Sequence, residues 1–219
     1  LQATAGAALL SCLPAALAQQ ASPGRAAWPA WDPFKAQYTD EGGRVVSDDD
    51  GGGPTYSEGQ DYAQFFALVA NARPLFDKLL RWTENNLCDG DITARLPAWL
   101  WGKRPDGSWG VIDSNAASDA DLWIAYALGE AGRLWNVRSY RAFSALVAAR
   151  ILREETAQLP GLGLTLLPAP QGFAQGDGRW RLNPSYMPMH LMHWLAAVDP
   201  QPEWKQLVDS SLKVIQGAS

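Results

Sequence analysis

The sequence predicts an all-α protein, and three observations lead to that fold class. Apolar residues recur at three- and four-residue intervals over most of the chain, which is the period of one helix face. No segment sustains the alternation of a half-buried strand, and no strand–helix–strand rhythm appears. Irregular stretches rich in glycine and proline separate the periodic segments. The pattern describes about six or seven helices, joined alternately by short turns and long loops, in a toroid of helical hairpins or a bundle.

The first part of the chain is expected to hold three helices. A short helix is expected within residues 28–38, and a glycine-rich loop with an acidic run at 48–50 follows over residues 40–55. The second helix begins near Ser57, and Pro74 suits the first turn of the third. The apolar sides of these two helices are expected to be Tyr62, Phe65, Phe66 and Val69, and then Leu75, Phe76, Leu79, Leu80 and Trp82.

The second part is expected to hold four more helices and two irregular stretches. The stretches are residues 89–117, with room for short strands, and residues 157–183, rich in glycine and proline. The helices are expected over residues 119–134, 140–151, 186–197 and 203–215.

Composition excludes some classes of function. The 219 residues suit one domain or part of a larger one, and 47% of them are apolar, enough for a substantial core. The net charge of −5 argues against nucleic acid as a partner, because nucleic-acid binding usually needs a basic face.

The N-terminal segment resembles a secretory signal. Residues 1–18 carry no charge, are apolar and small, and end in Ala-Leu-Ala, like the apolar core and cleavage site of such a signal. The initiator Met and the basic region are missing, so we expect a signal remnant, with residues 19–27 as a linker. The stretch is too short and alanine-rich for a membrane span. We therefore expect a periplasmic or secreted protein with no span in the mature chain; Cys12 leaves a lipoprotein as the alternative. Cys88 is expected to be a buried small apolar residue.

Glu58 is the first candidate for chemistry. It stands in the segment Tyr56-Ser-Glu-Gly-Gln60, flanked by Tyr56 and Tyr62. Burial among aromatic groups would raise the pKa of this carboxyl, as the general acid of glycoside cleavage requires. A structural interpretation also stands, in which a first-turn Glu is favoured by the helix dipole and Ser57 caps the helix.

Asp119 and Asp121 form the second candidate, at the start of an apolar helix. Ser118-x-x-Asp121 fits a capping box, which is the structural interpretation. In the functional interpretation, the helix N-terminus lowers the pKa of a carboxyl and keeps it ionised. An ionised Asp beside a sugar can stabilise an oxocarbenium-like transition state, orient a water or bind hydroxyls. Asn115 lies nearby and is expected to add a hydroxyl contact.

Tryptophan usage points to a sugar as ligand. The chain has 11 tryptophans, and Trp99, Trp101 and Trp109 cluster in the long stretch before the Asp pair. Indole faces pack well against the apolar faces of glucose rings, and the indole N–H donates a hydrogen bond. One or two of these three are expected to be sugar platforms. The helical tryptophans are expected in the core: Trp82, Trp123, Trp135 and Trp194.

Other chemistries find little support in the sequence. His190 and His193 have helical spacing but lack a further ligand at suitable spacing, so no metal site is expected. No Gly-x-Ser-x-Gly elbow occurs, and Gly161-Leu-Gly163 lacks the third glycine of a dinucleotide loop. No cofactor is expected.

The stretch from Ala117 to Trp135, Ala-Ser-Asp-Ala-Asp-x-x-Ile-Ala-x-Ala-Leu-Gly-x-Ala-x-x-x-Trp, resembles the signature of glycoside hydrolase family 8 along its whole length. Residues 56–60, 96–102 and 183–188 resemble other stretches of the family in the expected order. The resemblance covers about residues 28–215, and it implies that residues 28–219 are the N-terminal part of the catalytic domain. The implied fold is an (α/α)6 barrel, incomplete in this chain, which we expect to be truncated at both ends.

The resemblance also implies a reaction and roles. It implies an endo-β-1,4-glucanase that hydrolyses cellulose and cello-oligosaccharides with inversion, linked to bacterial cellulose synthesis, with a cellulose synthase complex as partner. Glu58 would be the general acid and Asp119 a catalytic aspartate, while Asp121 would support it or hold substrate. The acid and base carboxyls of such an enzyme should lie about 6.5–9.5 Å apart. Further residues expected to bind substrate are Tyr62, Trp99, Trp101, Trp109, Asn115 and Tyr186.

Two departures from the family pattern bear on activity. Asp61 and Gln64 follow the Ser-Glu-Gly-Gln segment where the family has small or apolar residues, and we expect them to be surface changes. The later Tyr-Asp-x-Ile-Arg-like stretch, which supplies the proposed general base, does not occur before Ser219. The alternative function is therefore a non-catalytic glucan-binding fragment that lacks the base, and a helical scaffold without sugar affinity is a third hypothesis.

Overall fold

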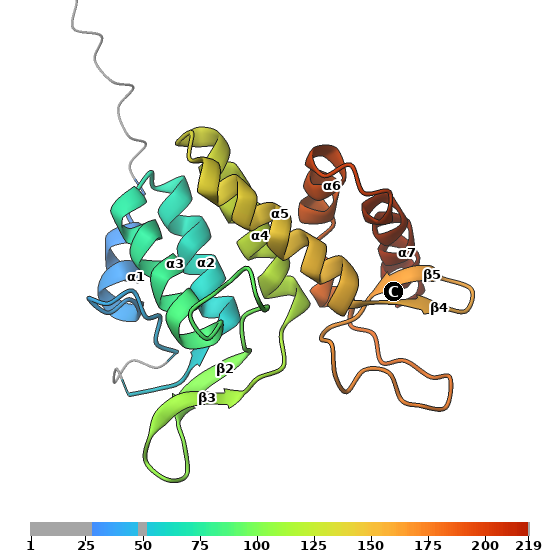
Figure 1. The fold of residues 1–219 in the computed structure, drawn as a ribbon, viewed down its shortest axis with the longest axis horizontal. Coiled ribbons are helices and arrows are strands. Elements are labelled where there is room, and N and C mark those ends of the chain that lie inside the picture. The colour runs from blue at the N-terminus through green and yellow to red at the C-terminus, as the bar shows by residue number, and fades with distance from the viewer. Residues whose placement is uncertain (1–27, 48–51, 219) are drawn as a thin grey trace, which may run out of the picture.

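The computed structural model describes residues 28–47 and 52–218. The signal remnant, the linker and the acidic run at 48–50 fall outside the described residues, so these expectations stay predictions. Over the described residues the chain forms helical hairpins, which Figure 1 colours from the N-terminus to the C-terminus. The helices are α1 (Trp31–Tyr38), α2 (Ser57–Val69), α3 (Arg73–Leu87), α4 (Ser118–Leu134), α5 (Arg138–Glu154), α6 (Met189–Val198) and α7 (Glu203–Gly217).

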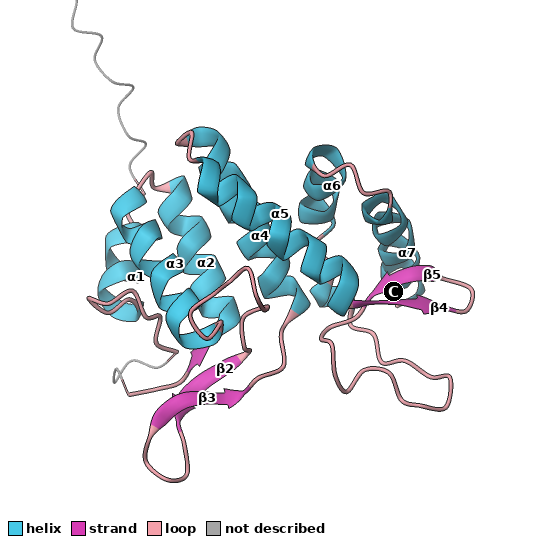
Figure 2. Ribbon diagram, viewed as in Figure 1, coloured by secondary structure: helices cyan, strands magenta, loops and turns pink. Residues whose placement is uncertain are grey.

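The strands are short and belong to the connections between hairpins. A sheet has the order β1 (Thr55–Tyr56), β2 (Leu100–Lys103) and β3 (Trp109–Asp113), and β4 (Thr156–Leu159) pairs with β5 (Gly163–Leu166). All of these pairs are antiparallel. The β4–β5 hairpin lies largely in the stretch 157–183, which the sequence predicted to be irregular. The prediction is therefore wrong for these residues. A 3-10 turn, η1 (Pro184–Tyr186), precedes α6. The strands and long loops gather at one end of the helices, the lower end in Figure 2.

The hairpins form an arc with two helical layers. α4 contacts α2 and α6, while α3, α5 and α7 each pack on the preceding helix. Short turns join the helices of each hairpin, and the long connections 88–117 and 155–188 join one hairpin to the next. This alternation confirms the spacing read from the sequence. It also places the N-terminal ends of α2 and α4 together, at the end where the strands lie.

The buried face of α2 differs from the prediction. Tyr62 and Val69 are 41% and 59% exposed, and Phe65 and Phe66 are half-buried. Phe65 instead packs beside Trp123 of α4, with ring centroids 4.8 Å apart, while Phe66 meets aromatic rings of the α1 segment. The face of α2 that is buried carries Ser57, Gln60, Asp61, Ala63, Gln64, Ala67 and Leu68. The aromatic stripe therefore marks the open side of an inner helix and not its core side.

Gln60 shows how a polar side chain is accommodated on that buried face. Its Oε1 accepts the backbone N–H of Val45 at 2.6 Å, and its Nε2 donates to the Gly43 carbonyl at 3.2 Å and to the Thr83 hydroxyl at 3.1 Å. A buried amide is stable only when its polar atoms find partners in this way. Gln60 thus ties the loop before β1 to α2 and α3, just below Glu58.

The hydrophobic core runs through α3, α4, α5 and α6. Its largest fully buried side chains include Phe76, Leu79, Leu122, Leu128 and Leu191. Cys88 is a free, buried cysteine, as predicted. The helical tryptophans expected in the core are only half-buried, although they pack against it: Trp82, Trp123, Trp135 and Trp194. No helix within the described ranges has the length and apolarity of a membrane span.

Gly129 of α4 provides a test of this packing. A Cβ atom at this position would lie 2.9 Å from the Ser144 hydroxyl of α5 and 3.0 Å from Cζ2 of Trp194 in α6. Ala has a higher helix propensity than Gly by roughly 1 kcal/mol, but overpacking costs about 1–3 kcal/mol. We expect Gly129→Ala to lower the free energy of unfolding, measured by urea denaturation. Gly217→Ala is the control, because no heavy atom lies within 4 Å of its Cβ position. A Gly129→Ala protein as stable as the Gly217→Ala protein would contradict the packing described.

Candidate active site

Glu58 lies in the first turn of α2, and the strand pairing directly before that helix fixes its position. β1 pairs with β2, and the backbone N–H of Ser57 donates to the carbonyl of Trp99 at 3.0 Å. The Trp99 indole N–H donates to Oε1 of Glu58 at 3.1 Å, and the Ser57 hydroxyl donates to Oε2 at 3.1 Å. The expected cap by Ser57 is wrong: the N-cap residue is Tyr56, and the Ser57 hydroxyl orients Glu58 instead.

Asp119 occupies the corresponding first turn of α4. Its Oδ1 accepts the backbone N–H of Ala120 at 2.9 Å, and the N–H of the preceding residue, Ser118, donates to the Pro168 carbonyl at 3.0 Å. Burial and then the negative charge of Glu58 raise the pKa of Asp119 to about 6. The two first-turn carboxyls are therefore close enough to act on each other electrostatically.

Two expectations for this helix start are wrong. No side chain caps α4: the N-cap residue is Ala117, and the Ser118 hydroxyl is buried without a hydrogen-bond partner in the described part of the chain. The helix N-terminus was also expected to lower the carboxyl pKa values here. Backbone N–H groups do favour the anion of Asp119, but burial and the like charge of Glu58 outweigh them, so the pKa rises.

Asp121 points away from the cleft, which overturns its expected contact with substrate. Its residue is 0% exposed, and so is Glu155, which directly follows α5. Both oxygens of each carboxyl are buried and find no donor among the described residues. Burial raises the pKa of both carboxyls well above the usual range. Asp121 can act on a substrate only through the residues around it.

Asp61 and Gln64 are not surface changes, contrary to expectation. Both lie on the buried face of α2, and the Asp61 carboxyl has no hydrogen-bond donor within the described ranges. The backbone N–H of Tyr62 favours the Asp61 anion but does not reach hydrogen-bond geometry. Burial, followed by the charges of Asp119 and Glu58, raises the pKa of Asp61 well above its ordinary value. A buried carboxyl without a hydrogen-bond donor in the described ranges therefore lies one helical turn after Glu58.

Tyr62 and Tyr186 both lie at the pair of carboxyls. Burial raises the pKa of each phenol, and the charges of Asp119 and Glu58 raise it further. Both phenols are therefore protonated hydroxyl donors beside acidic groups. Tyr62 comes from α2 and Tyr186 from the 3-10 turn before α6, so the site draws on separate hairpins.

Asn115 braces a loop. Its Nδ2 donates to the Gln171 carbonyl at 3.1 Å, and its Oδ1 accepts the Gln171 backbone N–H at 3.2 Å. Its backbone carbonyl also accepts the N–H of Trp99 at 2.7 Å. Through these hydrogen bonds Asn115 holds the 168–183 loop beside Trp99. As long as its amide is bonded to Gln171, it is not available for the expected contact with a sugar hydroxyl.

Trp101 and Trp109 lie apart from Glu58. Their rings stack on each other at 5.2 Å, and the Arg44 guanidinium lies 4.7 and 4.9 Å from the two ring centroids. Trp82 of α3 meets Trp101 edge-on at 5.3 Å. These contacts hold the β2–β3 hairpin against α3 and the loop before β1. Of the three candidate platforms, the structure brings only Trp99 to the acidic pair.

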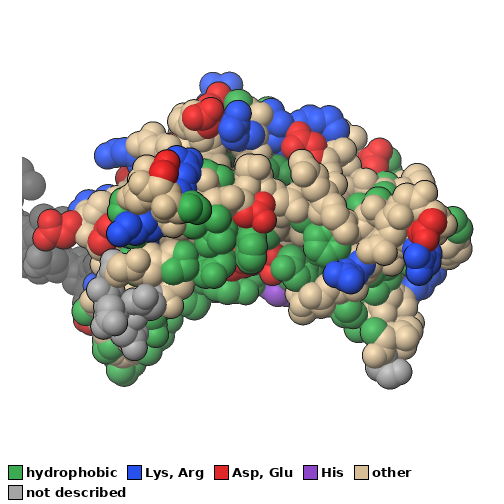
Figure 3. Space-filling view, turned by 90° about the horizontal axis from the view of Figure 1, so that it is seen from below, with side chains coloured by type: hydrophobic (Ala, Val, Ile, Leu, Met, Phe, Trp, Pro, Cys, Tyr) green, Lys and Arg blue, Asp and Glu red, His purple; other side chains and the backbone are tan. Residues whose placement is uncertain are grey.

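A cavity of about 220 Å³ lies beside Trp99, whose indole donates to Glu58. Its walls include Trp99, Phe173 and Tyr186, with Asp113 and Asn115 as polar lining. Ala117, two residues before Asp119, also lines it. Figure 3 looks onto this end of the molecule, which forms an arch with hydrophobic side chains along its concave side and acidic side chains near the middle. Phe173 was missed because its loop has no periodic pattern that could mark it.

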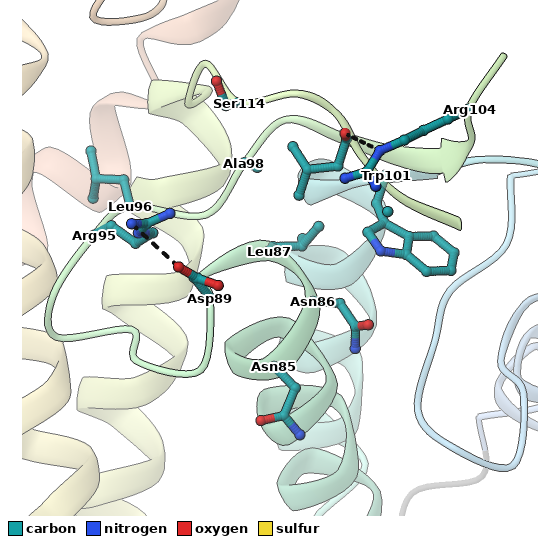
Figure 4. Close-up of a pocket in the computed structure, with 12 residues that line it drawn as sticks. Asn85, Asn86, Leu87, Asp89, Arg95, Leu96, Ala98, Trp101, Arg104 and Ser114 are labelled. Atoms are coloured by element: carbon teal, nitrogen blue, oxygen red, sulfur yellow. Dashed lines mark hydrogen bonds and ion pairs between the residues drawn. The ribbon is translucent and has the colours of Figure 1, made fainter. Parts of the chain in front are cut away.

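A larger cavity, of about 400 Å³, lies on the other side of β2–β3. Figure 4 shows its lining, which includes Asn85, Asn86, the ion pair of Arg95 with Asp89, and Arg104. Neither Glu58 nor Asp119 lines either cavity, but Trp99, whose indole donates to Glu58, lines the smaller one. Size alone would select the larger cavity, but this hydrogen bond and the raised pKa of Asp119 favour the smaller one as the candidate active site.

His190 and His193 stand on α6. The His190 ring lies 5.2 Å from that of Trp123. Within residues 28–47 and 52–218 no group of three His, Cys, Asp or Glu side chains is arranged to hold a metal ion.

The fold and the acidic pair define the class of protein. The sequence matches the family model described as "Glycosyl hydrolases family 8" over residues 4–219. The chain belongs to glycoside hydrolase family 8.

Named relatives and solved structures agree with this assignment. A protein named "Endoglucanase" from Escherichia coli O157:H7 is 51% identical over 167 residues, which are 76% of this chain and 45% of that protein. Another of the same name, from Xanthomonas axonopodis pv. citri, is 44% identical over 213 residues, or 97% of this chain and 54% of that protein. The crystal structure of endo-1,4-D-glucanase from Vibrio fischeri superposes with a TM-score of 0.82, at 52% identity, covering 85% of this chain and 54% of that one.

The chain thus spans about half the length of the relatives that it matches. The likeness to the family 8 endoglucanases confirms the expected (α/α)6-barrel class, of which the described arc of hairpins covers a part.

The raised pKa of Asp119 is open to a direct test. Because the Glu58 charge is one of its causes, Glu58→Gln should lower the pKa of Asp119 from about 6 toward its ordinary value. The measurement is an NMR titration of the side-chain carboxyl carbon of Asp119, assigned by its disappearance in Asp119→Asn. An Asp119 that titrates identically with and without Glu58 would show that the two groups do not interact.

Proposed function

We propose that this chain carries the acid-bearing part of an endo-β-1,4-glucanase, which hydrolyses internal glucosidic bonds of cellulose and cello-oligosaccharides with inversion. The observation that carries the proposal is the convergence of Glu58, hydrogen-bonded by Trp99, with Asp119 beside an aromatic-walled cavity. Membership of glycoside hydrolase family 8 and the names of its relatives support the same substrate class.

Glu58 is proposed as the general acid. An inverting glycosidase needs a carboxylic acid that protonates the leaving oxygen and a separate carboxylate that activates water. The Trp99 indole and the Ser57 hydroxyl hold the Glu58 carboxyl in one orientation beside the cavity. A fixed orientation matters because proton transfer requires the acid within hydrogen-bond reach of the glycosidic oxygen.

Asp119 is proposed to act on the sugar next to the bond that breaks. With a pKa of about 6 it is largely ionised at neutral pH, so it can accept hydroxyl hydrogen bonds and stabilise developing positive charge. The phenols of Tyr62 and Tyr186 are available as donors to the same sugar, and the Trp99 indole packs on its apolar face. Asp121 supports Asp119 from the protein interior and does not touch substrate.

Export and a link to cellulose synthesis complete the proposal. The signal-like residues 1–18 support a periplasmic or secreted enzyme. The resemblance to glucanases associated with bacterial cellulose synthesis supports a role beside a cellulose synthase complex.

Glu58→Gln tests the acid assignment in the protein expressed from its complete reading frame. Since general acid catalysis contributes about 10²–10⁴ in rate, we expect hydrolysis of carboxymethylcellulose to fall by that factor. Release of reducing ends is the measurement, and Asp209→Asn, an exposed position on α7, is the control. Wild-type turnover by Glu58→Gln would rule out Glu58 as the acid.

A second candidate function is glucan binding without hydrolysis. It needs the aromatic-walled cavity and the Trp99 indole but no general base. Tight binding of cellopentaose with no hydrolysis by the wild-type protein would favour it over the enzyme.

The placement of the tryptophans predicts which of them matters for binding. Trp99→Ala, in a Glu58→Gln background, should weaken cellopentaose binding by about tenfold, which corresponds to roughly 1.4 kcal/mol. Trp109→Ala should change it less than about twofold, because Trp109 stacks on Trp101 and Arg44 and not at the acidic pair. Titration calorimetry gives both values, and a larger effect at Trp109 would move the sugar site to the other side of the hairpin.

A further inference from the structure

The carboxyls of Asp121 and Glu155 meet inside the protein without a donor between them. Asp121 comes from the first turn of α4 and Glu155 follows the end of α5. Each carboxyl acts on the pKa of the other, so the two side chains lie close together, although as carboxylates both are acceptors only. None of their four oxygens has a hydrogen-bond donor among the described residues. Two buried carboxylates in contact would repel strongly, so this arrangement requires a proton.

Backbone hydrogen bonds close a ring around these two side chains. The N–H of Ser118 donates to the Pro168 carbonyl at 3.0 Å, and the N–H of Leu167 donates to the Glu155 carbonyl at 2.8 Å. The side-chain contact of Asp121 with Glu155 is then the third link between the start of α4, residues 167–168 and the end of α5. Pro168 lines the 220 Å³ cavity, so the ring borders the candidate active site.

We propose that Asp121 and Glu155 share one proton at neutral pH and act as a positioning pair, which holds the first turn of α4, and with it Asp119, against residues 167–168. The pair carries one negative charge and not two. Its hydrogen bond is donated by one carboxyl to the other. Loss of that proton would separate the two carboxyls and open the ring beside the cavity.

The surroundings of the pair supply further reason for it to keep a proton. Burial is the largest influence and raises both pKa values. The groups that face the pair are acidic or a thiol, and they come from α2, the end of α3, α4 and α5: Glu58, Asp61, Cys88, Asp119 and Glu154. The Glu154 carboxylate is itself paired with Arg150 at 2.7 Å.

The pH dependence of stability tests the shared proton. A carboxyl whose pKa is raised on folding takes up a proton that the unfolded chain has released, so stability falls as pH rises from about 4 toward the raised value. Asp121→Asn and Glu155→Gln each replace the proton with an amide donor and retain one charge. We expect each variant to fold, and to take up about one proton fewer on folding at pH 7, read from the slope of unfolding free energy against pH.

One alanine variant and one surface variant provide matched comparisons for the two amide variants. Glu155→Ala leaves Asp121 buried without its partner, so it should be less stable than Glu155→Gln at every pH. Asp209→Asn, on the exposed side of α7, should leave the slope unchanged. The infrared band of a protonated carboxyl at neutral pH should lose intensity in Asp121→Asn and Glu155→Gln but not in Asp209→Asn. Unchanged slopes and bands in both amide variants would overturn the shared proton.

A pH–rate profile separates positioning from mere packing, and this readout alone rests on the proposed glucanase function. Each single amide variant keeps the charge of the pair, so its profile should match the wild type. The double variant, Asp121→Asn with Glu155→Gln, removes a negative charge near Asp119 and should shift the limb governed by Asp119 to lower pH. Identical profiles in all variants would overturn the positioning role. An inactive wild-type protein would refute the function and leave the stability test intact.

Discussion

The side-by-side packing of α2 and α4, with their N-termini at the same end, is the constraint on which the site depends. Each helix begins directly after an extended segment that is fixed by backbone pairing: Ser57 through β1 and the Trp99 carbonyl, and Ser118 through the Pro168 carbonyl. The first turns of the two helices therefore cannot shift independently of the sheet and loops. Glu58 and Asp119 converge because of this backbone geometry, before any side-chain interaction acts.

Convergence of carboxyls in a partly buried site raises an electrostatic problem. Glu58 and Asp119 are partly exposed, while Asp61, Asp121 and Glu155 are fully buried, and full ionisation of all five would place like charges together in a medium of low dielectric. Burial resolves the conflict by holding protons on the inner groups. Negative charge then remains in the cleft, where it can interact with a sugar. The buried carboxyls keep their protons and carry little charge. The raised pKa of Asp119 reflects its own burial first and the charge of Glu58 second.

Most of the fold could be predicted from the sequence, because helices and connections leave separate local signals. Apolar spacing located α2 to α7 and Pro74 marked the start of α3, whereas the β4–β5 hairpin was missed because its strands are short and lie in a glycine-rich stretch. The error at α2 was physical: an inner helix of a hairpin arc has aromatic residues on its open side, so Tyr62 and Phe65 imitate a core stripe. Periodicity reports that a face is apolar, and it does not report what that face contacts.

Site residues could be predicted only as far as chemistry follows from position in a helix. Glu58 and Asp119 could be proposed from the sequence because each lies in the first turn of an expected helix, and Trp99 because it precedes the Asp pair. The roles of Asp121 and Trp101 were wrong or unsupported, because i and i+2 on a helix point in different directions, and a register shift between Leu100 and Trp101 interrupts the regular alternation of β2. Glu155 had no sequence signal at all, since its partner lies 34 positions earlier in the chain. Only tertiary contact could reveal that pair.

The buried acids also explain why α4 is packed so closely elsewhere. Groups that must take up protons on folding reduce stability as the pH rises, so this end of α2 and α4 works against the folded state at neutral pH. The opposing contribution comes from the middle of α4, where Leu122, Ile124 and Leu128 are fully buried and Gly129 lets Trp194 of α6 approach the helix backbone. One helix thus combines a destabilising functional turn with a tightly packed apolar body.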